Sequence, residues 1–98
     1  MSIFNTPNVW VLISMILESE KDTHSEAERN DPLRRMAMWC MFKDKADKLE
    51  SIEKRDATLE DLARIYKGGE FGYMDTETVP YWIELHQKMH PILEEINK

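Results

Sequence analysis

The chain has 98 residues, 42% of them hydrophobic and 33% charged, and a formal net charge of −6. This balance is too apolar for a disordered protein and fits one soluble globular domain, residues 1–98. A domain of this length buries only roughly 65% of its unfolded surface, so we expect marginal stability and stabilisation by a second copy. Because a net acidic chain repels phosphate, we expect no indiscriminate binding to nucleic acid.

The first predicted helix begins at Thr6-Pro7 and runs to about Glu20. Thr6 can cap the first free amides, and Pro7 suits the first helical position. The apolar residues in 9–17 leave almost no polar face, which is typical of a helix buried on more than one side. The stretch is shorter than the about 20 residues of a membrane span, and no Lys or Arg precedes it, so we expect neither a span nor a signal peptide.

A second helix is predicted after the polar residues 18–31. Within that polar segment, Thr23-x-x-Glu26 is a capping box that could start a short turn of helix. Asp31-Pro32 is again a cap followed by proline, and no helix breaker follows until about Arg55. The second helix is therefore the longest of the chain.

This helix carries three methionines, a tryptophan, a phenylalanine and the only cysteine in residues 36–42. Its packed face, at the 3-4-3 spacing of a helix, consists of Trp39, Phe42, Ala46 and Leu49, with Met36 one turn before them. Met38 and Met41 lie off this face, and we expect Cys40 to be a core or interface residue. Because methionine suits adaptable surfaces, the stretch indicates either a Met-rich core or a core with an added interface.

A third helix is predicted from Thr58, which forms a relative of the capping box with Asp61, to Gly68-Gly69. The segment 68–77 that follows is turn-like. It nevertheless contains the large side chains Phe71, Tyr73 and Met74, which a plain solvent loop does not need.

The last predicted helix begins near Thr78, with Pro80 in its first turn. Its apolar residues recur at the spacing of a seam between helices, namely Trp82, Leu85, Met89, Ile92 and Ile96. Pro91 removes one backbone hydrogen bond and clashes with the preceding turn, so we expect a kink there. Together the segments predict an all-α fold, a compact bundle of three to four helices with the last one kinked at a proline.

Two histidines are the candidates for metal chemistry. His86 and His90 are four residues apart on the last helix, which is the spacing of helical zinc ligands. Gln87 stands where a metalloprotease needs its glutamate base, and Pro91 distorts the helix before a third ligand, so the pair is a weak candidate. We therefore expect no metal, no cofactor and no enzymatic activity.

The favoured function is that of a small acidic cytoplasmic regulator or inhibitor, of the type that phages and mobile elements encode, which docks on another protein. One cysteine cannot form an internal disulfide, which favours a reducing compartment. The residues expected to bind the partner are Arg34, Arg35, Met38, Met41, Phe71 and Tyr73. We also expect a homodimer formed through the first helix or the methionine-rich turn of the second.

Three alternatives stay open. Residues 58–69 are typical of the first helix of a helix-turn-helix, which would make the protein a DNA-binding regulator, although no Lys or Arg follows until Lys88. Residues 50–98 carry eleven acids against six bases, so a mimic of nucleic acid that blocks a basic host protein is the second. A metal-dependent helical enzyme built on His86 and His90 is the third.

Overall fold

Helices are the only regular elements in residues 2–20 and 25–98, the part of the chain that the computed structural model describes. The α-helices are α1 (Asn8–Ser19), α2 (Glu26–Arg29), α3 (Pro32–Glu53), α4 (Leu59–Gly68) and α5 (Val79–Ile96). Three 3₁₀ turns, η1 (Ile3–Asn5), η2 (Gly72–Met74) and η3 (Thr76–Thr78), complete the described part. The predicted all-α fold class is confirmed.

Local hydrogen bonds explain where α3 and α4 begin. The Asp31 carboxylate accepts a hydrogen bond of 2.9 Å from the Leu33 amide, and proline follows as the first residue of α3. At α4 the capping box is complete, because Thr58 and Asp61 each accept a bond from the amide of the other. Such caps satisfy amides that have no partner inside the helix, so both predicted starts are confirmed.

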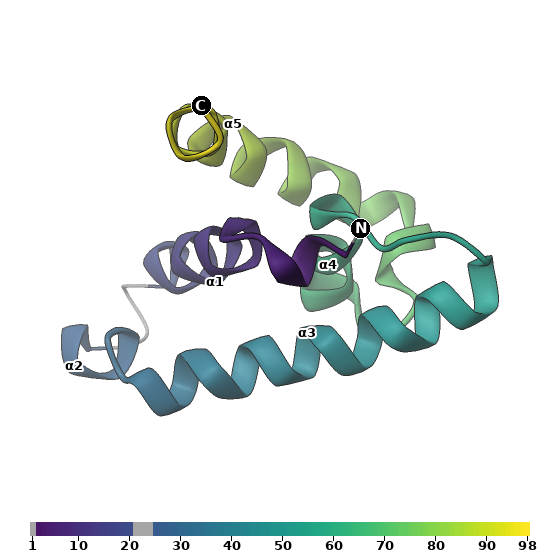
Figure 1. Cartoon of the computed structure of the whole chain (residues 1–98), viewed down its shortest axis with the longest axis horizontal. Coiled ribbons are helices and arrows are strands. Elements are labelled where there is room, and N and C mark those ends of the chain that lie inside the picture. The colour runs from purple at the N-terminus through teal and green to yellow at the C-terminus, as the bar shows by residue number, and fades with distance from the viewer. Residues whose placement is uncertain (1, 21–24) are drawn as a thin grey trace.

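Helix α1 lies in the middle of the molecule. In Figure 1, α3 runs along one side and α5 along the opposite side, with α1 and α4 between them. Helix α1 packs against α3, α4 and α5. Its side chains Val9, Leu12, Ile13, Ile16 and Leu17 are therefore fully enclosed. These five residues follow one face of α1 at helical spacing, whereas Trp10 is 42% exposed and Glu18 is exposed. The expected burial on more than one side is therefore wrong for the far side of this helix.

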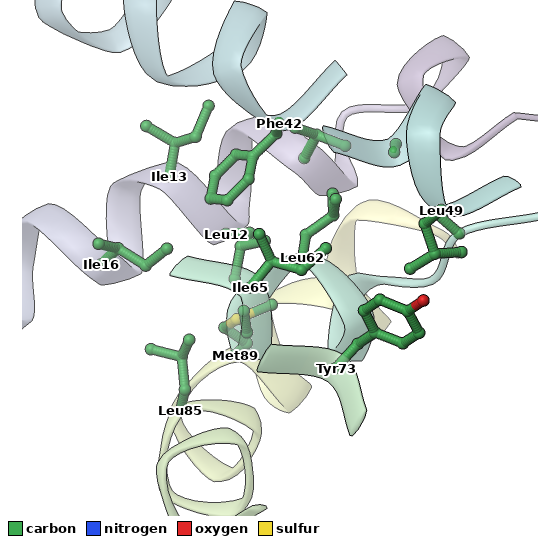
Figure 2. Close-up of a cluster of buried hydrophobic side chains, with 14 of the residues drawn as sticks. Leu12, Ile13, Ile16, Phe42, Leu49, Leu62, Ile65, Tyr73, Leu85 and Met89 are labelled. Carbon is green, nitrogen blue, oxygen red and sulfur yellow. The ribbon is translucent and has the colours of Figure 1, made fainter. Parts of the chain in front are cut away.

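The core forms where α1, α4 and α5 meet the middle of α3 (Figure 2). Phe42 is the largest side chain that is completely buried, and Ala46 and Leu49 continue the same face of α3. Leu62 from α4 and Met89 from α5 close the opposite side. Burying a side chain of this size contributes about 1.5–3 kcal/mol, so one apolar stripe on each helix accounts for the packing.

Two predicted details concern the short helix before α3 and the proline inside α5. The short helix α2 exists, and the Ser25 hydroxyl caps it by accepting a bond of 3.2 Å from the Glu28 amide. The cap proposed at Thr23 lies outside the described residues. Helix α5 continues through Pro91 to Ile96, and the expected kink at this proline stays a prediction.

Candidate functional site

The six side chains predicted to bind a partner are placed very differently by the fold. Arg34 lies 3.8 Å from the Glu20 carboxylate, and Arg35 donates a bond of 2.7 Å to the Ser14 hydroxyl. Both arginines are half-buried and hold α3 against the C-terminal half of α1. Their binding to a partner stays a prediction, and the structure assigns them a contact within the chain.

Met38 and Met41 also make their contacts within the chain. Both are half-buried and pack against the core. One exposed apolar surface of α3 lies instead on its first two turns, on the side away from the core, and is formed by Leu33, Met36, Ala37 and Cys40; Ile52 near the other end of α3 is exposed as well. We call these four residues the α3 outer face. Leu33 is 76% exposed and Met36 is 58% exposed, so the assignment of Met36 to the packed face is wrong.

Cys40 belongs to this outer face and is exposed rather than enclosed in the core. Beside it, Trp39 is half-buried between Phe4 and Trp10. The rings of Trp10 and Trp39 are stacked with centroids 6.2 Å apart, and Phe4 meets Trp39 edge to face at 5.4 Å. These aromatic contacts fix the start of α1 on α3.

The segment between α4 and α5, residues 69–78, is the second candidate surface. We call it the 69–78 loop. The Thr78 hydroxyl lies 2.8 Å from the Gly72 carbonyl oxygen and 2.7 Å from that of Asp75. Arg64 of α4 donates from Nε to the Thr78 hydroxyl at 2.8 Å and from Nη2 to the Asp75 carbonyl at 3.1 Å. One arginine and one threonine thus bond to each other and to the backbone at two points of the loop.

Gly72 brings the loop backbone directly onto α4. A Cβ atom at this position would lie 2.1 Å from the carbonyl oxygen of Arg64, closer than two atoms can approach. Only glycine therefore fits. Gly69 has φ +90°, in the region that favours glycine, and turns the chain at the end of α4. The two glycines and the Arg64–Thr78 contacts set the conformation of the loop.

The aromatic and methionine residues of the loop point in different directions. Tyr73 is 7% exposed and belongs to the core, and its hydroxyl donates a bond of 3.0 Å to the Glu53 carboxylate of α3. Burial raises the pKa of Tyr73, and the bond to Glu53 raises it further, so this hydroxyl stays protonated and donates. Phe71 is 51% exposed and Met74 is 57% exposed. The loop holds Tyr73 inward and presents its two neighbours to solvent.

Phe71 and Met74 have acidic neighbours along the chain, one of which is paired with two lysines of α3. No Lys or Arg occurs in residues 68–87, and Asp75 and Glu77 of the loop are exposed. Glu70 lies 3.1 Å from Lys48 and 3.7 Å from Lys45 of α3. The hydrogen bond from Lys48 holds the pKa of Glu70 below its ordinary value, so this carboxylate is ionised at neutral pH.

The two histidines make contacts with other side chains of α5. The His86 ring stacks on Trp82 with centroids 4.9 Å apart, and His90 lies 3.3 Å from Glu94. No cluster of three His, Cys, Asp or Glu side chains with the geometry of a metal site occurs in the part that is described. Whether the pair ever binds metal stays a prediction.

Sequence reasoning noticed Met74 but did not count it among the binding residues, and it missed Leu33 and the exposure of Met36. For Leu33 the signal was present, because a residue three positions before Met36 and seven before Cys40 lies on the same side of a helix. For Met74 the direction of the side chain had no signal, since a turn-like segment has no fixed period.

Comparison with protein-family models, with curated proteins and with solved structures finds no match to this chain. None of the helices in the described part combines the length and the hydropathy that crossing a membrane requires.

Proposed function

We propose that this protein is a small regulator or inhibitor that docks on another protein through the 69–78 loop. The observation that carries the proposal is the exposure of Phe71 and Met74 on a loop whose backbone is held by Arg64 and Thr78. Aromatic and methionine side chains are enriched at the centres of protein interfaces. A monomeric protein gains no stability from holding two of them in water.

The rigidity of the loop favours binding. Ordering a mobile segment on association costs free energy, and a preformed conformation avoids most of that cost. Thr78 is buried, and Gly72 has no space for a side chain, so the loop is already ordered in the free protein. Phe71 and Met74 are thus available as anchors for an apolar pocket on the partner.

The charge of the loop indicates which charge the partner surface carries. Asp75 and Glu77 are exposed and lie within a few residues of the two anchors along the chain, whereas Glu70 is paired with Lys48 and Lys45 of α3. Residues 68–87 contain no Lys or Arg. Such a surface is complementary to an apolar pocket with Lys or Arg at its rim. We place the protein inside the cell, because the exposed thiol of Cys40 is suited to a reducing compartment.

DNA binding finds less support. Ten residues, 69–78, separate α4 from α5, whereas a helix-turn-helix joins its helices by a turn of about 3–4 residues. Acids in this segment repel the phosphate backbone. The acidic surface is compatible with a mimic of nucleic acid, but mimicry does not explain why Phe71 and Met74 are displayed.

The test compares wild-type protein with the double variant Phe71→Ala/Met74→Ala as baits on lysate of the native host. The matched control is Leu33→Ala/Met36→Ala, which removes similar exposed apolar surface from the α3 outer face. An anchor residue contributes about 2 kcal/mol or more, or roughly 30-fold in affinity. We expect a partner that wild type and control retain and that the loop variant binds at least about 30-fold more weakly. Equal retention by all three baits, or no retained protein, contradicts the proposal.

A further inference from the structure

Four side chains of α5 form a continuous row along one side of the helix, spaced four residues apart: Trp82, His86, His90 and Glu94. The rings of Trp82 and His86 are stacked with centroids 4.9 Å apart. The rings of His86 and His90 meet edge to face with centroids 5.5 Å apart, and Nε2 of His90 lies 3.3 Å from the Glu94 carboxylate. Because residues four apart share one side of a helix, the two imidazoles are direct neighbours in this row.

Pro91 lies within the row but does not separate its members. A proline at this position was expected to distort the helix between His90 and any group further along. Helix α5 nevertheless continues to Ile96, and the Glu94 side chain contacts the imidazole of His90 across the proline. The row therefore extends over both sides of Pro91.

The separation of the two imidazoles is close to that of two ligands on one metal ion. A ligating histidine nitrogen lies about 2.0–2.1 Å from a zinc ion, and the centre of the ring lies roughly 1 Å further out. Two such rings at the tetrahedral angle have centroids about 5 Å apart. The centroids of His86 and His90 are 5.5 Å apart, so both rings can bind one ion by rotation about their side-chain bonds, without a movement of α5.

The two outer members of the row orient the inner pair. Trp82 covers a face of the His86 ring, with 18° between the two planes, and a contact with the face leaves the in-plane nitrogens free. The Glu94 carboxylate lies beside Nε2 of His90. It favours a proton on this nitrogen and leaves the lone pair on Nδ1 for an ion. Metal-binding histidines commonly have a carboxylate beside their other nitrogen, which fixes the ring and raises its basicity.

The pair is accessible to an ion from solution. The His90 side chain is 55% exposed, and His86 is half-buried. The chain carries a net charge of −6, which attracts cations. The part of the chain that the structure describes contains no cluster of three His, Cys, Asp or Glu side chains at metal-binding distances. The protein therefore supplies two ligands, and water completes the coordination.

We propose that His86 and His90 together bind one divalent transition-metal ion, at a site independent of the 69–78 loop. Imidazole suits Zn²⁺, Cu²⁺ and Ni²⁺, and affinity in such sites is highest for Cu²⁺. Gln87 occupies the position of the glutamate base in a zinc protease. That base acts in hydrolysis and does not hold the ion, so Gln87 leaves binding unaffected.

Calorimetric titration of the untagged protein with Cu²⁺, Ni²⁺ and Zn²⁺ salts tests the proposal. We expect one ion per chain, bound most tightly for Cu²⁺. Loss of an outer partner of a metal ligand costs about 10–100-fold in affinity, so loss of a ligand in His86→Ala or His90→Ala should cost at least about tenfold. Glu94→Gln should weaken binding by a smaller factor. The matched control is His24→Ala, which removes the third histidine of the chain and should leave the affinity unchanged.

Two further measurements distinguish this pair from ion binding elsewhere on the acidic surface. The affinity should fall as the pH is lowered, because protons compete with the metal for the imidazoles. Paramagnetic Cu²⁺ at low stoichiometry should broaden the amide resonances of residues 82–94 before all others in NMR spectra. The proposal is overturned if the wild type binds none of the three ions. Equal affinity of wild type and His86→Ala/His90→Ala, or broadening that begins at acids outside α5, overturns it as well.

Discussion

Asp61 is the buried charge on which the start of α4 depends. Its side chain is 8% exposed. Arg55 donates to both carboxylate oxygens, at 2.7 and 3.1 Å, and the Thr58 amide donates at 2.9 Å. Replacing Asp61 by Ala removes the capping box, which costs about 1 kcal/mol, and bonds to a charged group worth about 1.5–3 kcal/mol.

The net loss is smaller than this sum, because the partners stay accessible to water. Arg55 is 46% exposed and Thr58 is exposed, so both are solvated again when the carboxylate is removed. We therefore expect Asp61→Ala to lower the free energy of unfolding by about 2–3 kcal/mol. For a domain of this size each kcal/mol corresponds to about 4–8 °C in Tm. Urea denaturation monitored by circular dichroism measures the change.

The same site predicts a pH dependence. Burial raises the pKa of Asp61, but the hydrogen bonds from Arg55 and Thr58 outweigh it and hold the pKa below its ordinary value. A carboxyl with a lowered pKa in the folded state contributes stability above its unfolded pKa of about 3.9. That contribution is lost as the pH falls through the folded pKa.

The gap in stability between wild type and Asp61→Asn should therefore be full above about pH 5 and should narrow below about pH 4. Asp47→Asn is the control, because Asp47 forms an exposed pair with Lys43 at 2.8 Å and such pairs contribute about 0.3–0.5 kcal/mol. The role given to Asp61 is refuted if the difference in unfolding free energy at pH 7 is below about 0.5 kcal/mol, the contribution of a surface pair. A difference that does not change with pH refutes it as well.

Two further pairs of substitutions test the packing. Gly72→Ala should cost about 3 kcal/mol or more, because the new Cβ lies 2.1 Å from a backbone oxygen, whereas Gly69→Ala meets no neighbour and should cost about 1–2 kcal/mol for its φ alone. Urea titration of both variants checks this order, and equal losses contradict the close approach. Phe42→Ala should cost about 3–5 kcal/mol, and Met36→Ala on the exposed side should cost almost nothing, as thermal melts will show. A similar loss for both would mean that α3 is rotated.

The helix starts could be predicted because they depend on neighbours in sequence. A cap at Asp31 or Thr58 needs only an amide two or three residues away, and a proline at the first helical position restricts its own φ. Phe42, Ala46 and Leu49 were assigned correctly for a similar reason, since their spacing places them on one side of any helix.

Which other residues join a packed face depends on the partner helix. Met36 has the right spacing to continue the face of Phe42, yet α1 does not cover it and it is exposed. Lys48 of the same helix lies 3.1 Å from Glu70 of the 69–78 loop, a contact between segments far apart in the chain. Periodicity within one helix contains no information on such contacts.

The sequence shows the two candidate surfaces to different degrees. The 69–78 loop was visible in the sequence, because large apolar side chains in a turn-like segment need an explanation. The direction of each side chain was not visible, since Tyr73 points inward only because Gly72 rests on the Arg64 carbonyl. A surface depression lined by residues from the start of the chain, the start of α4 and α5 likewise brings together segments that no local pattern relates. Part of the apolar excess of the chain is thus buried where α1 and α3 pack on each other, and the large apolar side chains that stay exposed are spread over α1, α3, the 69–78 loop and α5.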